Sequence, residues 1–83
     1  MDYEKRNTKE RRAEIRKIIN KGNESAYSVT TKLNNGKFDI NIYSQVNFYL
    51  RKLLADGKVK VIITEGKKTN KKQYELLQQY KGT

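Results

Sequence analysis

Residues 41–57 read NIYSQVNFYLRKLLADG, and their apolar pattern is the strongest in the chain. The apolar residues recur every three or four positions, which at about 100° per residue places them on one side of a helix. These residues are Ile42, Val46, Tyr49, Leu50 and Leu53. Asp39 or Asn41 can cap the amino end, and Gly57 can end the helix in a left-handed conformation. We therefore predict a helix over residues 41–56.

The opposite side of this predicted helix is polar, apart from one aromatic residue. Its polar residues are Ser44, Gln45, Arg51 and Lys52, with Tyr43 and Asn47 on one flank. Phe48 lies on the same side. A large apolar side chain on a solvated face indicates that something covers it. We therefore expect a contact surface here, with Phe48 touching a ligand, another element of the fold or a second subunit.

Two shorter helices are predicted before this segment. Residues 7–21 carry isoleucines at the spacing of one helical stripe, and Asn7 is placed to cap them. Residues 25–33 repeat that spacing with small and apolar side chains, and Ser25 is the expected cap. Between the second and third helices, residues 37–40 alternate apolar and polar side chains, which predicts a short strand.

After the third helix the apolar period changes to two, which is typical of strands. Alternating residues on both sides of a polar interruption predict an antiparallel hairpin over residues 58–77. A two-stranded hairpin is not stable alone in water, so its apolar side chains are expected to lie against the helices. These side chains are Val59, Val61, Ile63, Tyr74 and Leu76. The tip of the hairpin is basic and carries Lys67, Lys68, Lys71 and Lys72.

Three helices followed by a carboxy-terminal hairpin predict an α+β fold of the winged helix-turn-helix type, in which the hairpin is the wing. Residues 42–59 also resemble the recognition helix and first wing strand of small bacterial and archaeal winged-helix repressors of the multiple-antibiotic-resistance and arsenical-resistance type. The matching residues are Ser44, Val46, Leu50, Arg51, Lys52, Leu53, Gly57 and Val59. The chain departs from these families at Asn47, where they commonly have Ser, and at Lys58, where they have an apolar residue.

The resemblance implies that helix 41–55 enters the major groove of double-stranded DNA while the wing touches a phosphate or the minor groove. Amide side chains pair with adenine, a guanidinium pairs with guanine or phosphate, and an aromatic ring contacts a thymine methyl. The helix residues that we assign to such contacts are Tyr43, Ser44, Gln45, Asn47, Phe48, Arg51 and Lys52.

Other basic and polar residues have two interpretations each. The lysines of the hairpin tip fit phosphates without reading sequence, because an ammonium is a point charge, but lysines also protect hairpin edges from aggregation. Ser25 and Tyr27 start a helix whose amino end carries partial positive charge, so both can donate to a phosphate. They can equally be a plain cap and a plain core aromatic. Arg11 and Arg12 are interpreted as solvated charges.

The chain is strongly basic, since 19 Lys and Arg oppose 9 Asp and Glu to give a net charge of +10 on 83 residues. Such a surplus raises the local concentration of a polyanion and makes association depend on salt. It can also merely keep a small protein soluble. Together with the resemblance, it leads us to expect a binder of double-stranded DNA, with a homodimer possible, acting in transcriptional repression, replication or segregation.

Several chemistries are excluded by residue types that the chain lacks. It contains no Cys and no His, so a zinc finger or a Ser-His or Cys-His nucleophile cannot be built. The carboxylates are scattered, and no pair has catalytic spacing. We expect no enzymatic activity, no metal and no cofactor. The length predicts one domain over residues 1–83, and the lack of a long apolar run predicts a cytoplasmic, nucleoid-associated protein without membrane contact.

Two other functions are compatible with the sequence. An adaptor for protein partners would use Phe48, Ile62 and Leu77 as an apolar surface. A binder of RNA or single strands would stack bases on the tyrosines and phenylalanines. Because Tyr49 and Tyr74 lie on predicted core faces, few aromatic residues remain for such a platform.

Overall fold

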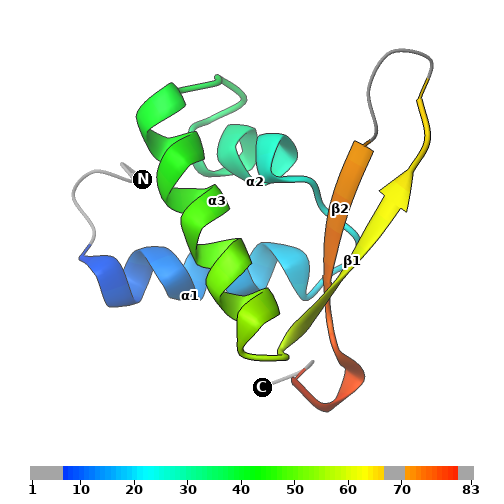
Figure 1. Cartoon of the computed structure of the whole chain (residues 1–83). Coiled ribbons are helices and arrows are strands. Elements are labelled where there is room, and N and C mark those ends of the chain that lie inside the picture. Colours follow the sequence, from blue (N-terminus) through cyan, green and yellow to red (C-terminus); the bar gives the residue numbers. More distant parts are fainter. Residues whose placement is uncertain (1–6, 67–70, 81–83) are drawn as a thin grey trace.

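The computed structural model describes residues 7–66 and 71–80. Three helices come first and a two-stranded antiparallel hairpin follows, so the chain has an α+β fold with a winged-helix-like topology. The elements are α1 (Thr8–Ile19), α2 (Ala26–Leu33), α3 (Ile40–Ala55), β1 (Val59–Thr64), β2 (Lys71–Leu76) and the short 3-10 helix η2 (Gln78–Tyr80). Figure 1 shows α3 crossing α1, with the two strands of the hairpin on one side of the helices and α2 between the first turns of α3 and β2.

Each helix begins at a side chain that accepts hydrogen bonds from the first backbone N–H groups, which have no partner within the helix. Asn7 Oδ1 accepts from the N–H of Glu10 at 2.8 Å. Asp39 accepts from the N–H of Asn41 at 2.8 Å and from that of Ile42 at 3.2 Å. Of the two residues that the sequence offers as the cap of α3, Asp39 therefore fills the position.

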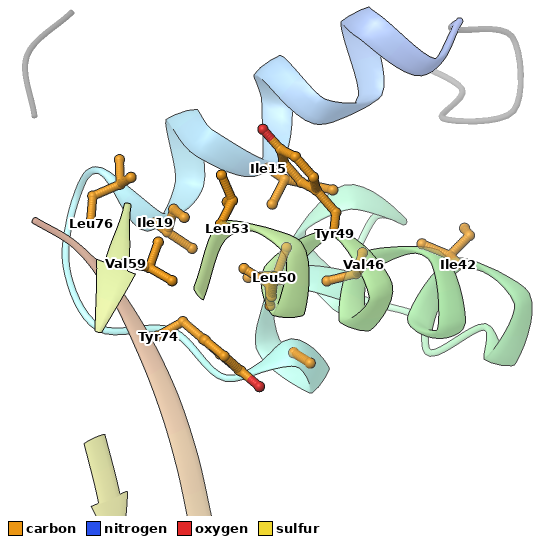
Figure 2. Close-up of a cluster of buried hydrophobic side chains, with 12 residues drawn as sticks. Ile15, Ile19, Ile42, Val46, Tyr49, Leu50, Leu53, Val59, Tyr74 and Leu76 are labelled. Carbon is orange, nitrogen blue, oxygen red and sulfur yellow. The ribbon is translucent and has the colours of Figure 1, made fainter. Parts of the chain in front are cut away.

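The core lies between the three helices and the base of the hairpin (Figure 2). Every residue on the predicted apolar side of α3 is buried, which confirms that side as the packing face. The remaining buried apolar residues are Ile15, Ile19, Ala26, Val29, Val59, Tyr74 and Leu76. Each large apolar side chain that is buried contributes about 1.5–3 kcal/mol, so α3 supplies much of the stability of the fold.

Only the base of the hairpin packs against the helices. Val59, Tyr74 and Leu76 are buried and Val61 is half-buried, as predicted, but Ile63 is 55% exposed. The prediction for Ile63 is therefore wrong. The alternating pattern identifies which face of a strand is apolar, but it does not tell how far along β1 that face is covered, and burial falls from Val59 to Ile63.

The predicted short strand at residues 37–40 is also wrong. Asn35 and Gly36 turn the chain with φ values of 55° and 87°, and Ile40 is already the first residue of α3. The sheet of the described residues has two strands, and the link between α1 and α2 adds one isolated bridge to it, where Glu24 pairs with Tyr74 of β2. The N–H of Glu24 donates to the Tyr74 carbonyl at 3.0 Å, and the N–H of Tyr74 donates to the Glu24 carbonyl at 2.6 Å.

The helices are short. α3 has 16 residues, whereas a helix that spans a bilayer needs about 20 apolar ones. Across residues 7–66 and 71–80, no helix combines the length and the apolar character that crossing a membrane requires.

Candidate functional site

The outward side of α3 is set by the burial of its opposite side in the core. Ser44, Gln45, Phe48, Arg51 and Lys52 are exposed, and Tyr43 and Asn47 are half-buried. Phe48 is 67% exposed, so within the described residues no element covers it. A shallow hollow of about 310 Å³ runs along this side and is lined by Ile40, Tyr43, Ser44, Asn47, Phe48 and Arg51. Six of the seven residues predicted on α3 thus line a hollow here or on its flanks.

One flank of α3 faces the hairpin across an open hollow of about 570 Å³, which we call the wing cleft. α2, α3 and β2 all contribute to it. Its lining residues are Ser25, Ala26, Tyr27, Ser28, Tyr43, Asn47, Lys71, Lys72 and Tyr74. Two lysines and no carboxylate are among them. The cleft therefore brings together six of the predicted site residues, which come from separate elements. They are Ser25, Tyr27, Tyr43, Asn47, Lys71 and Lys72.

The wing lysines lie at the start of β2. Lys71 and Lys72 are exposed and stand opposite Thr64 and Ile63 of β1. Their side chains form no hydrogen bond or ion pair with any residue in the ranges 7–66 and 71–80. The other two predicted lysines of the tip, Lys67 and Lys68, lie outside the described residues.

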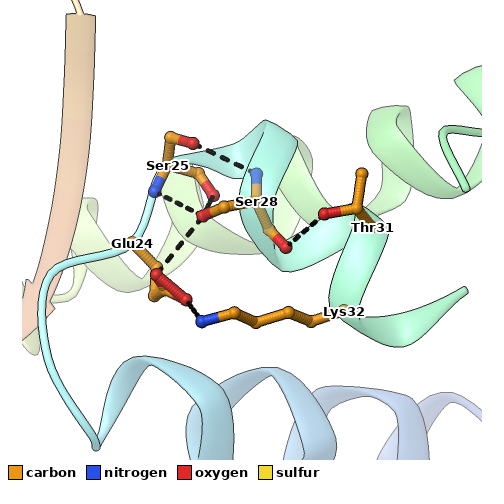
Figure 3. Close-up of polar contacts among 5 residues, drawn as sticks. All are labelled: Glu24, Ser25, Ser28, Thr31 and Lys32. Carbon is orange, nitrogen blue, oxygen red and sulfur yellow. Dashed lines mark hydrogen bonds and ion pairs between the residues drawn. The ribbon is translucent and has the colours of Figure 1, made fainter. Parts of the chain in front are cut away.

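Ser25 caps the amino end of α2, which was one of the two roles considered for it in the sequence analysis (Figure 3). Ser25 Oγ accepts from the N–H of Ser28, and Ser28 Oγ accepts from the N–H of Ser25, both at 3.1 Å. Ser28 Oγ also lies 3.4 Å from a carboxylate oxygen of Glu24, whose other oxygen pairs with Lys32. Lys32 thus compensates the negative charge of Glu24 beside this helix end.

Tyr27 is not a core aromatic, because 57% of it is exposed. Its ring stacks on Phe38, with centroids 5.1 Å apart and planes 15° apart. Phe38 in turn contacts Tyr43, with centroids 5.4 Å apart and planes tilted by 51°. We call Tyr27, Phe38 and Tyr43 the aromatic stack. Phe38 was not among the predicted site residues. The one feature of the sequence that could have indicated it is an apolar residue between the turn at Gly36 and the cap Asp39.

The other flank of α3 faces α1 across a hollow of about 370 Å³, which we call the α1 groove. Its lining residues are Thr8, Arg11, Arg12, Ile15, Ser44, Gln45, Phe48 and Tyr49. The guanidinium carbon of Arg12 lies 4.9 Å from the centre of the Tyr49 ring, and Arg16 Nη1 donates to Tyr49 Oη at 2.6 Å. Arg11 Nη1 donates to Gln45 Oε1 at 3.2 Å. Arg11 and Arg12 are therefore not solvated charges, and Gln45 holds a contact within the fold.

Comparisons with protein families, with curated proteins and with solved structures found no match to this chain. The winged-helix-like topology is accordingly read from the order of the helices and the register of the hairpin alone.

Proposed function

We propose that this protein binds double-stranded DNA, with α3 in the major groove and the hairpin on the phosphate backbone. The observation that carries the proposal is the wing cleft, where Asn47 of α3 lies in one hollow with Lys71 and Lys72 of β2. The polar side of the helix and the basic strand therefore face the same ligand. A base edge and a neighbouring phosphate are the chemical groups that such a pair of surfaces fits.

The dimensions and side chains of α3 support this placement. A helix with its side chains is about 10–12 Å wide, and the major groove of B-form DNA is about 12 Å wide. Asn47 can make paired hydrogen bonds to adenine, and Arg51 can make them to guanine. Phe48 is exposed between them and the α1 groove, where a thymine methyl would cover it.

The charge of the chain supplies the affinity in this proposal. Lysines neutralise phosphates and release condensed counterions, so the binding constant falls as salt rises. Lys71 and Lys72 carry no partner in the described ranges, which leaves both ammonium groups open to phosphates. The regulatory role that fits best is repression of transcription or an accessory task in replication or segregation, carried out by a monomer or a homodimer.

The test is binding to a random-sequence duplex at increasing salt, followed by fluorescence anisotropy. We expect clear binding at low salt and at least about tenfold weaker binding when salt rises from about 50 to about 200 mM. A binding constant that does not change with salt, or no binding at low salt, would contradict the proposal. Light scattering of the same samples gives the number of chains in the complex.

An adaptor function is the second candidate, because Phe48 and Ile40 are 67% and 62% exposed and line the same hollow along α3. The sequence analysis named Ile62 and Leu77 as further apolar contacts. Both are half-buried, and they lie in or next to the hairpin, not on α3. Failure to bind any duplex, with the protein folded, would favour a protein partner over DNA.

A further inference from the structure

We propose that the aromatic stack binds unpaired bases, so that the preferred ligand is duplex DNA that continues into a single strand. The duplex part of this ligand rests on the proposed function. The single-stranded part rests on a separate observation, which is that Tyr27 and Tyr43 of the stack line the wing cleft together with Lys71 and Lys72.

The geometry of the stack suits a base as the next ring. The rings of Tyr27 and Phe38 are nearly parallel, with 15° between their planes. Tyr43 of α3 contacts the ring of Phe38. Tyr27 is the outer ring, and more than half of it is exposed although Phe38 lies against it. A flat aromatic base can extend this column, and every base has a π-face that stacks in this way.

The stack is not part of the core. Tyr27 and Phe38 lie outside the buried cluster, whereas Tyr43 packs against it. Tyr43 thus anchors two exposed rings from α2 and from the link before α3. Clustered exposed aromatics of this kind mark binding surfaces in small proteins, because solvent exposure of a large apolar area is unfavourable without a ligand.

An intact duplex cannot use these rings fully. Inside a double helix the π-faces of the bases are covered by their neighbours, and only the base edges reach the grooves. An unpaired base exposes its faces and can leave the duplex axis. Its backbone would then pass Lys71 and Lys72, two charges that hold phosphates without demanding a sequence. Glu24, whose carboxylate contacts Ser28 of the cleft lining, is paired with Lys32, which compensates its charge.

The experiment compares a blunt duplex with the same duplex carrying a single-stranded thymine tail, using fluorescence anisotropy at one salt concentration. The wild-type protein is expected to bind the tailed duplex at least about fivefold more tightly, the contribution of one stacked base. Tyr27→Leu should abolish this difference, and the readout is the ratio of the two binding constants measured with the same variant. Tyr27→Phe keeps the ring and should keep the preference, which separates stacking from hydrogen bonding by the hydroxyl.

Phe48→Leu is the matched control, since Phe48 is an equally exposed aromatic residue of α3 that is not in the stack. It should weaken both ligands alike and preserve their ratio. Thermal unfolding of Tyr27→Leu must show a folded protein, and Phe38→Leu should repeat its effect on the ratio. Equal binding of blunt and tailed duplexes by the wild type, or a preference that survives Tyr27→Leu, overturns the stacking proposal alone. The single-stranded tail alone is the third ligand. Tight binding of this strand with no binding of the blunt duplex supports the stack and overturns the proposed duplex function.

Discussion

The two flanks of α3 both carry positive side chains, but they use them differently. On the flank that faces α1, the guanidinium groups of Arg12 and Arg16 contact the buried Tyr49. In the wing cleft, the ammonium groups of Lys71 and Lys72 have no partner within residues 7–66 and 71–80. Net charge alone does not separate these groups. The contacts show that the cations of one flank join α1 to α3, and we propose that those of the other flank bind DNA.

The choice of residue type fits this division. A guanidinium is planar and stacks on an aromatic face while its N–H groups donate in fixed directions, which suits a packed contact such as that of Arg12 with Tyr49. An ammonium on a long stem is strongly hydrated and points in no fixed direction, which suits phosphates at varying positions. We therefore expect changes on the α1 side to alter stability, and changes on the wing side to alter DNA binding.

Tyr49→Ala tests the α1 flank most severely. It removes a buried aromatic ring together with the contacts of Arg12 and Arg16, and should lower the free energy of unfolding by about 3–5 kcal/mol. Urea denaturation followed by circular dichroism measures it. Tyr49→Phe keeps the ring, loses only the hydrogen bond from Arg16 and should lower that free energy by about 1 kcal/mol. Equal losses in the two variants would show that the ring itself contributes little.

Asn47→Ala tests the wing flank where it meets the outward side of α3. We expect the preference for a selected DNA site over random duplex to fall by about 1–3 kcal/mol, because a paired contact to a base is lost. Competition binding against a site enriched from a random pool measures this preference. Gln45→Ala is the control on the other flank, where Arg11 already occupies the amide oxygen. A larger effect from Gln45 than from Asn47 would reverse the assignment of the flanks.

The double variant Lys71→Ala with Lys72→Ala tests whether the wing lysines meet phosphates. The plot of log binding constant against log salt should become shallower by about 2, with all duplex sequences weakened alike. Lys9→Ala with Lys17→Ala removes the same charge from exposed positions of α1 outside both hollows, and should change the slope much less. Identical slopes for the two double variants would mean that DNA responds only to net charge.

Arg12→Ala should have the smallest effect in this set. Loss of its contact with the Tyr49 ring is expected to lower the free energy of unfolding by about 0.5–1 kcal/mol and to leave the affinity for random duplex nearly unchanged. Chemical denaturation and anisotropy on the same protein give both values. A marked loss of DNA affinity without a loss of stability would place Arg12 in the interface and remove the distinction between the flanks.

The sequence predicted the parts of the fold that repeat. The apolar spacing of α3 and the alternation at the base of the hairpin both reflect packing against the core, and both are confirmed. Single contacts leave no such periodic signal. The pairing of Glu24 with Tyr74 involves one residue on each side and was not predicted, whereas residues 37–40 alternate apolar and polar side chains but form no strand. Ile63 shows the same limit, since periodicity does not reveal where the helices end beside a strand.

The candidate site was predicted in its residues more than in its arrangement. Asn47 and the wing lysines were selected for their chemistry, and the structure adds that they share a hollow. The aromatic stack was not predicted, because its three rings come from α2, a link and α3 and meet only in the folded chain. The expectation of too few available aromatics for base stacking counted the buried Tyr49 and Tyr74 correctly, but did not foresee that Tyr27 and Phe38 would gather outside.

The main-chain pairing between Glu24 and Tyr74 has a mechanical consequence. It fastens the lower part of β2 to the residue that precedes the cap of α2, so the floor of the wing cleft has a constant width unless two backbone hydrogen bonds break. Between Tyr74 and Lys71, the main chain of β2 pairs with β1 alone within the described ranges, so this part of the hairpin has no backbone link to the helices. In the proposed complex with DNA, this end of the hairpin would adjust to duplexes of different groove width while α3 keeps its position.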